Sequence, residues 1–207
     1  MLYSWIFHPL TTFLVGILLA VVGVVIFLKS NTPSNDSKSQ VTSYQAALDQ
    51  VKPGTLETES LAETAALERF KTFLQGIGNI NSVRERTIQT YAADAYLDDT
   101  LVVHHGAAEI QSYFEKTSKA MTSYQVTIDD VARSGRDYYV RWTMVFAAPA
   151  LSGGEPCYSV GISQIRFNHD GKIGLHRDFW DSGKNFHAHL PIIGGAVGFV
   201  QKRLEAN

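Results

Sequence analysis

The densest group of side chains that could do chemistry lies between His176 and Asp181, where the sequence reads His-Arg-Asp-Phe-Trp-Asp. In an extended strand, His176, Asp178 and Trp180 point to one side. A carboxylate beside an imidazole in an apolar pocket can abstract and return a proton, which suits acid/base chemistry on a small apolar substrate. We therefore expect Asp178 and His176 to be the catalytic pair if this face of the strand lines a cavity.

The same carboxylate has a structural alternative. On a solvent-facing sheet surface, Asp178 would instead form an ion pair with Arg177 or Arg141. Strand parity determines which side chains share a face, but it does not tell which face is covered. Both interpretations stay open until the orientation of the His176 face is known.

A second group of ionisable residues, His104-His105, stands directly before Gly106. Adjacent residues of an extended segment face opposite ways, so only one of these imidazoles can enter a cavity, and we expect it to be His104. A zinc site made by His104, His176 and Asp98 would have none of the ligand spacings typical of zinc proteins. We therefore predict no metal site.

The sequence lacks the motifs that mark the common cofactor sites. The sequence has no glycine-rich phosphate loop, no nucleophile elbow and no dinucleotide fingerprint, so we expect no cofactor. The neighbouring carboxylates of Asp98 and Asp99 are expected to form a polar turn between a helix and a strand.

With 18 basic and 20 acidic residues, the chain lacks the basic excess typical of nucleic-acid binding. The single cysteine, Cys157, excludes an internal disulfide.

The elements that would position these residues change type along the chain. Apolar residues recur at helical spacing from Leu61 to Leu74, over 83–92 and over 110–114. From Ser123 the period changes to two, which indicates strands. In the third of these strands the apolar face switches between Ile162 and Ile165, which suggests a bulge. Helices followed by a long antiparallel meander predict an α+β fold, a curved antiparallel sheet packed against N-terminal helices.

This order of elements resembles the NTF2-like superfamily and, within it, the SnoaL-like branch. The resemblance rests on the following segments: Glu68-Arg69-Phe70, Tyr96-Leu97-Asp98-Asp99, Gly106 leading into Ile110 and Phe114, and Gly171 through Asp181. It covers about residues 65–190 and implies a cone, in which helices and a curved sheet enclose one apolar cavity. Members include isomerase-, cyclase- and dehydratase-like enzymes that use a cavity Asp or an Asp/His pair, as well as non-catalytic proteins.

The resemblance implies a set of cavity-lining residues: Tyr91, Tyr96, His104, Trp142 and Trp180. Two functions follow from it. In the first, the domain binds a small apolar or lipid-like ligand and carries out cofactor-free acid/base chemistry. In the second, side chains fill the cavity and the domain is a non-enzymatic module for homodimerisation or protein contact.

The first part of the chain contains an uncharged apolar run, Leu10–Leu28. As a helix it would be about 28 Å long, close to the thickness of a bilayer core. A cleaved signal peptide is the alternative, but no Lys or Arg precedes the run and no Ala-x-Ala site follows it. We predict a single-pass anchor, and Lys29 and Lys38 on its C-terminal side favour a cytoplasmic location for the following domain.

We therefore predict four parts: a transmembrane anchor over 1–29, a flexible tether over 30–60, the SnoaL-like domain over 61–190 and an apolar helix over 191–207. Apolar residues of this last segment, from Ile193 to Leu204, recur at helical spacing, and Lys202 and Arg203 follow most of them. The segment either packs across the mouth of the cone, or forms a dimer contact, or lies on the membrane surface.

Overall fold

The structure, a computed structural model, describes residues 37–51 and 56–205. The chain divides into two compact units, 1–44 and 45–207, and the second contains the whole sheet. The predicted membrane anchor over Leu10–Leu28 lies outside the described residues. Among the residues that are described, no helix is long and apolar enough to cross a bilayer.

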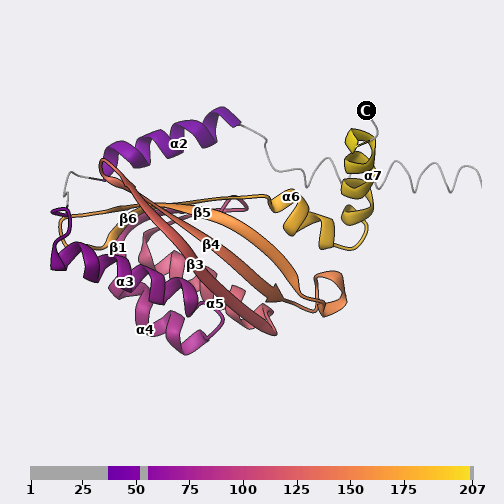
Figure 1. Cartoon of the computed structure of the whole chain (residues 1–207), viewed down its shortest axis with the longest axis horizontal. Coiled ribbons are helices and arrows are strands. Elements are labelled where there is room, and N and C mark those ends of the chain that lie inside the picture. The colour runs from indigo at the N-terminus through magenta and orange to yellow at the C-terminus, as the bar shows by residue number, and fades with distance from the viewer. Residues whose placement is uncertain (1–36, 52–55, 206–207) are drawn as a thin grey trace, which may run out of the picture. The chain divides into compact units, whose positions relative to one another are not determined.

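Six α-helices, two short 3₁₀ helices and six strands follow one another along the described chain (Figure 1). The helices are α2 (Ser37–Gln50), α3 (Leu61–Gln75), α4 (Ile80–Thr90), α5 (Gly106–Ala120), α6 (Ser182–Asn185) and α7 (Ile193–Glu205), with η1 (Ser152–Gly154) and η2 (His187–His189). The strands are β1 (Tyr91–Asp98), β2 (Val103–His105), β3 (Ser123–Ser134), β4 (Asp137–Ala147), β5 (Cys157–Phe167) and β6 (Ile173–Trp180).

The strands form one sheet in the order β2-β1-β6-β5-β4-β3. The predicted α+β class is confirmed, but the prediction of an entirely antiparallel sheet is wrong. Strand β1 pairs with β6 in parallel, while all other neighbours are antiparallel. A parallel pair needs a long crossover between its strands. Here the crossover comprises most of the domain, and it brings β1 beside the last strand, β6.

The start of β1 also differs from the prediction. Residues 83–92 were expected to be helical, but α4 ends at Thr90, and Tyr91 and Ala92 already belong to β1. Local spacing does not mark this boundary, because Tyr91 is apolar and correctly placed for either period. Tertiary contacts decide it: Tyr91 pairs with Ile173 of β6, and its ring is almost completely buried.

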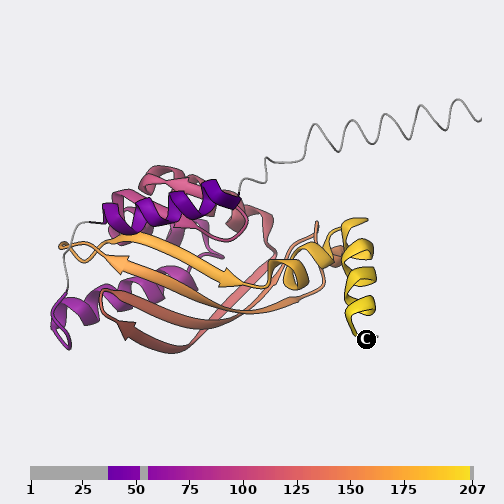
Figure 2. The ribbon, with the colours of Figure 1, turned by 90° about the horizontal axis from the view of Figure 1, so that it is seen from above.

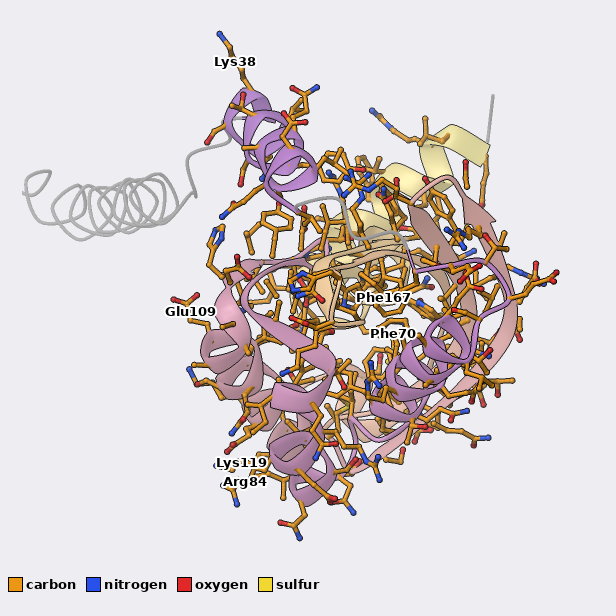
Figure 3. The ribbon with its side chains drawn as sticks, turned by 90° about the vertical axis from the view of Figure 1, so that its left-hand side faces the viewer. Lys38, Phe70, Arg84, Glu109, Lys119 and Phe167 are labelled. Carbon is orange, nitrogen blue, oxygen red and sulfur yellow. The ribbon has the colours of Figure 1, made fainter. Side chains whose placement is uncertain are left out.

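Helices α3, α4 and α5 cover one face of the curved sheet (Figure 1). Their apolar residues meet the inner face of the sheet in a single core. Phe70 from α3 and Phe167 from β5 point into this core, whereas Arg84, Glu109 and Lys119 point away from it (Figure 3). The helical spacing of apolar residues therefore predicted the covered face of α5 and of the second half of α3 correctly, whereas Leu61 at the start of α3 is 90% exposed.

The apolar residues of β5 switch faces along the strand, but no bulge causes the switch, because the pairing of β5 with β4 is continuous. The apolar side chains of Tyr158, Val160 and Ile162 lie on the outer, exposed face, while Ile165 lies in the core. The predicted bulge between Ile162 and Ile165 is therefore wrong. Small residues occupy the inner positions of the first half of the strand: Cys157, Ser159, Gly161 and Ser163. They leave room above the sheet.

A bulge does occur one strand later. In the pairing of β5 with β6 the register shifts between Arg166 and Phe167, and Gly174 is the residue left over. Because the extra residue reverses the parity, Ile173 lies in the same inner core as Phe70, and His176 also faces the inside. Strand parity alone would place Ile173 and Leu175 on the same face, but the bulge at Gly174 puts them on opposite faces.

The predicted C-terminal helix is present as α7, which lies next to α6 and η2 beyond the end of the sheet (Figures 1 and 2). A side chain at Gly194 would collide with the carbonyl oxygen of Ala188, so glycine permits this contact. No residue of α7 is buried within the described part of the chain. Ile193, Phe199 and Leu204 keep about half or more of their surface exposed.

Glu63 joins the first turn of α3 to the sheet. Its carboxylate accepts hydrogen bonds from Arg133 Nη1 at 2.6 Å, from the Tyr138 hydroxyl at 2.6 Å and from the backbone N–H of Glu59 at 2.7 Å. Burial acts to raise the pKa of Glu63, but these hydrogen bonds and the charge of Arg133 outweigh it and lower the pKa below the usual value.

We expect Glu63→Gln to flatten the acid limb of the stability curve. Because the folded pKa is lowered, the contribution of Glu63 is complete above the ordinary pKa of 4.5 and is lost as the pH falls through the lower, folded value. Urea midpoints at pH 6 and pH 3 should therefore differ less in the variant than in the wild type. Glu68→Gln, which removes only the surface pair with Lys71, is the control. Equal pH dependence in wild type and Glu63→Gln would contradict this role.

Candidate functional site

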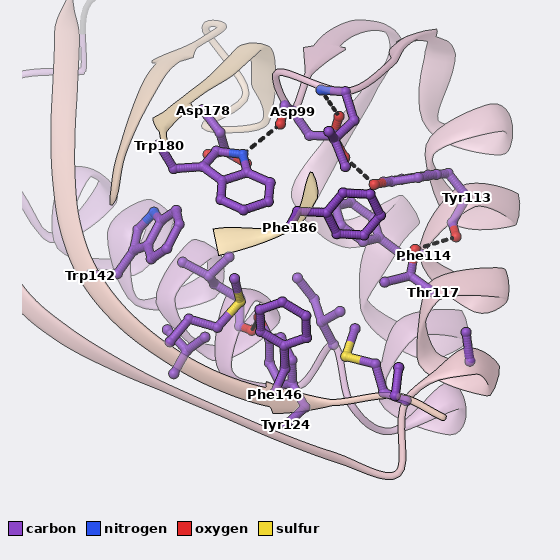
Figure 4. Close-up of a pocket in the computed structure, with 18 of the residues that line it drawn as sticks. Asp99, Tyr113, Phe114, Thr117, Tyr124, Trp142, Phe146, Asp178, Trp180 and Phe186 are labelled. Atoms are coloured by element: carbon purple, nitrogen blue, oxygen red, sulfur yellow. Dashed lines mark hydrogen bonds between the residues drawn. The ribbon is translucent and has the colours of Figure 1, made fainter. Parts of the chain in front are cut away.

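A cavity of about 360 Å³ lies between the inner face of the sheet and helix α5 (Figure 4). Its walls are mainly apolar and aromatic, with Phe114 from α5, Trp142 and Phe146 from β4, and Phe186 from the segment after β6. Gly161 of β5 lies directly under the Trp142 ring, so the indole packs closely on this strand and itself forms part of the cavity wall. The volume lies within the range of small-molecule sites.

His176 stands fully buried at the edge of the cavity. Its Nδ1 lies 2.7 Å from the Tyr91 hydroxyl, and its Nε2 lies 2.9 Å from Asp178 Oδ1. Phe70 packs edge-on against the imidazole with the ring centres 5.2 Å apart. Two hydrogen bonds and the aromatic contact therefore fix both the position and the plane of this ring.

Asp178 also lines the cavity, and its Oδ1 carries two hydrogen bonds. Besides His176, the hydroxyl of Ser163 donates to this oxygen at 2.5 Å, and the Trp142 indole N–H donates to Ser163 Oγ at 3.0 Å. Among the described residues, no donor reaches Oδ2. The arrangement holds the carboxylate firmly by one oxygen and leaves the other for an incoming group.

The ion pair that was the structural alternative for Asp178 has different members. Arg177 points to the other side of β6, where its Nε lies 3.5 Å from Asp98 Oδ2. The structure therefore places the His176 face of the strand toward the helices and the cavity. Sequence parity correctly separated His176 and Asp178 from Arg177.

A second carboxylate, Asp99, lines the same end of the cavity. Its Oδ1 accepts the backbone N–H groups of Leu101 and Val102, each at 2.9 Å, and its Oδ2 accepts the Tyr113 hydroxyl. The Trp180 indole N–H donates to the backbone carbonyl of Asp99 at 2.8 Å (Figure 4). A polar turn is present, but it joins strands β1 and β2 rather than a helix and a strand, and it presents Asp99 to the cavity while Asp98 faces outward.

The charge of Asp178 reaches several groups around the cavity. Burial raises the pKa of Asp99, and the negative charge of Asp178 raises it further, while the hydrogen bonds from Tyr113 and the backbone act against this. The pKa values of Tyr91, Tyr113 and Tyr124 are also raised, first by burial and then by nearby carboxylates including Asp178. These phenols therefore stay protonated and act as hydrogen-bond donors.

The five residues expected to line the cavity lie in four different places. Trp142 and Trp180 form part of its wall. Tyr91 stands behind His176 and reaches the cavity only through it. Tyr96 lies on the opposite face of the sheet, beside Gly174 and Val51.

His104 packs against the outer side of the wall formed by Tyr113, with the ring centres 4.6 Å apart. Its Nε2 is buried and has no hydrogen-bond partner among the described residues. His104, His176 and Asp98 do not come together, and the described part of the chain has no group of three potential metal ligands.

Two polar residues of the site, Ser163 and Asp99, were not expected from the sequence. The signal for Ser163 was the alternation of small residues in β5, which marks the inner face once the apolar residues are assigned to the outside. Asp99 had no comparable signal, since a turn between two strands would explain its side chain equally well.

The comparison with known families agrees with this architecture. A family model described as the SnoaL-like domain matches residues 67–176, just over half of the 207-residue chain. The chain belongs to the SnoaL-like domain family. The match includes most of α3, all of α4 and α5, the sheet up to His176 and most of the cavity wall. No curated protein matches the chain.

Solved structures share the fold of this SnoaL-like domain at low sequence identity. TsrD from Streptomyces laurentii is 16% identical with a TM-score of 0.51, covering 65% of this chain and 98% of its own. An NTF2-like protein from Anabaena variabilis is 16% identical with a TM-score of 0.51, covering 63% and 98%. A protein with a ketosteroid isomerase-like fold from Catenulispora acidiphila, solved with trimethylamine, is 16% identical with a TM-score of 0.50, covering 59% and 92%. The expected NTF2-like fold is confirmed.

Proposed function

We propose that this SnoaL-like domain binds a small, largely apolar molecule in its cavity and that Asp178 exchanges a proton with it. The observation that carries the proposal is the contrast within one cavity of about 360 Å³: apolar walls, and a single end that holds carboxylates. Desolvation in such a place strengthens the interaction between a carboxylate and a ligand group.

Asp178, His176 and Tyr91 have different roles in this proton exchange. Asp178 Oδ2 accepts or returns the proton, because Oδ1 is occupied by Ser163 and His176. His176 is a positioning residue that holds the carboxylate, and Tyr91 holds His176 in turn. No step of this scheme uses a cofactor, since the proton moves between the carboxylate and the ligand.

Native mass spectrometry of the full chain purified in mild detergent tests the proposal, with a co-purified small molecule as the expected result. Incubation in D₂O should then introduce deuterium at a carbon atom of that molecule with the wild type and not with Asp178→Asn. A co-purified molecule that exchanges equally fast with both proteins would contradict the role of Asp178 as the proton acceptor.

Filling the cavity should abolish ligand binding. Met144 lines the cavity from β4, whereas the next residue, Val145, does not line it. We expect Met144→Trp to reduce the affinity for 1-octanol at least tenfold in calorimetric titration, since the indole ring would occupy the space of the ligand. Val145→Trp is the matched control, and it also corrects for partitioning of octanol into detergent. Equal affinity of both variants and the wild type would place octanol binding outside the cavity.

The alternative function, a homodimerisation module, has an observation of its own. Tyr158, Val160, Ile162 and Phe179 expose between 39% and 67% of their surface on the outer face of neighbouring strands β5 and β6. We propose a second copy of this chain as the partner, because two such faces are self-complementary apolar surfaces. Analytical ultracentrifugation should show a dimer for the wild type and a monomer for Val160→Glu. A monomeric wild type would contradict the proposal.

The membrane tether over residues 10–28 and the cytoplasmic side of the domain stay predictions. Alkaline phosphatase fused after Asn207 should be inactive if the domain is cytoplasmic. Strong phosphatase activity would place the domain on the other side of the membrane.

A further inference from the structure

The polar end of the cavity carries negative groups without a matching positive one. Asp99 and Asp178 both line it, and none of the described residues that line the cavity is a lysine or an arginine. The nearby Arg177 points to the opposite side of β6, toward Asp98. Any positive charge that balances these carboxylates therefore has to come from His176 or from a ligand.

The hydrogen bonds of His176 favour a neutral imidazole. The buried Tyr91 hydroxyl has His176 Nδ1 as its only hydrogen-bond partner in the described part of the chain, so it donates its proton there. Nδ1 is then the acceptor, and the ring proton sits on Nε2, which donates to Asp178 Oδ1. A neutral His176 satisfies all three residues and leaves the charge of Asp178 uncompensated.

Aromatic rings surround the same end of the cavity. Trp180 lies beside Asp178, and Tyr113 and Phe186 lie on the side of Asp99, with Trp142 on the adjacent wall (Figure 4). The face of an aromatic ring carries partial negative charge and attracts cations, most strongly in a desolvated place. Carboxylates and ring faces together form an environment that suits a cation and opposes an anion.

We infer that the ligand carries an ammonium group on an apolar body, with the ammonium held between Asp99 and Asp178 and the body along Trp142 and Phe146. This inference rests on the proposed function, because it specifies the chemistry of a ligand of the same cavity. The ammonium would supply the missing positive charge and donate to the free Oδ2 of Asp178. A carboxylate ligand of equal size would meet two like charges at this end.

Three probes of equal chain length test the inference: octylamine, 1-octanol and octanoate, titrated calorimetrically against the full chain at neutral pH. We expect octylammonium to bind at least tenfold more tightly than octanol, and octanoate to bind most weakly. Octanol binding as tightly as octylammonium would overturn the inference and leave the proposed function intact. Failure of all three probes to bind would contradict the proposed function itself.

Substitution of the carboxylates locates the effect. Asp178→Asn and Asp99→Asn should each remove most of the preference for octylammonium while changing octanol affinity little. Asp98→Asn, which alters the neighbouring carboxylate outside the cavity, should keep the full preference. If Asp99→Asn fails to fold because the amide nitrogen replaces the oxygen that accepts the Tyr113 hydroxyl, Asp178→Asn decides alone. An unchanged preference in Asp178→Asn would overturn the inference.

Discussion

Replacing His176 by alanine is expected to lower the free energy of unfolding by about 3 kcal/mol, because it leaves the buried Tyr91 hydroxyl without a partner, removes one of the two hydrogen bonds to Asp178 and opens a cavity. The ring is fully buried, and it joins the Tyr91 hydroxyl on β1 to the Asp178 carboxylate on β6. It also packs edge-on against Phe70 of α3. One substitution therefore weakens contacts among two strands and a helix.

Urea denaturation measures this loss. His169→Ala is the control, since the side chain of His169 is 78% exposed and pairs with the neighbouring Asp170. We expect the control to change stability by less than about 0.5 kcal/mol. A loss below about 1 kcal/mol for His176→Ala would show that the imidazole does not connect these elements, and the positioning role assigned to it would be wrong.

Gly161→Ala should destabilise the domain by about 2 kcal/mol and weaken ligand binding together, because an added methyl group overpacks this part of the core. A Cβ at this position would lie 2.4 Å from Trp142 Cζ2. The indole would have to move, and its hydrogen bond to Ser163 would be lost, which releases one support of the Asp178 carboxylate.

The matched control for this variant is Gly195→Ala in α7, where an added methyl group meets no atom within 4 Å. It should leave stability unchanged or raise it by up to about 1 kcal/mol through helix propensity. Urea midpoints and octanol titrations of both variants test the prediction. A Gly161→Ala protein as stable as the wild type would contradict the close packing of Trp142 against β5.

The main elements and the grouping of His176 with Asp178 could be predicted, because strand parity and helical spacing are local properties of the sequence. The fold class could be predicted for the same reason. The parallel pairing of β1 with β6 could not, since it joins residues about 80 positions apart and depends on contacts that no local period records. Tyr91 is an example. Its spacing from the preceding apolar residues fits a helix, but it lies in strand β1, where its hydroxyl forms a hydrogen bond with His176.

The composition of the site was only partly predictable. Residues on one strand, such as His176, Asp178 and Trp180, are grouped by parity alone. Asp99 reaches the cavity from a turn, where parity does not apply. The bulge at Gly174 likewise reverses the face of β6 through a one-residue difference between neighbouring strands, which appears only when the pairing with β5 is known.

A ligand in the cavity would lie against Trp142 and Trp180, so the indole N–H signals of the full chain report on its binding. The chain has three tryptophans, Trp5, Trp142 and Trp180, so a ¹H–¹⁵N spectrum contains three indole signals. The indole N–H groups of Trp142 and Trp180 donate to Ser163 and to the Asp99 carbonyl. Addition of octylamine should shift these two signals. Octylamine that binds without shifting either of them would contradict binding in this cavity.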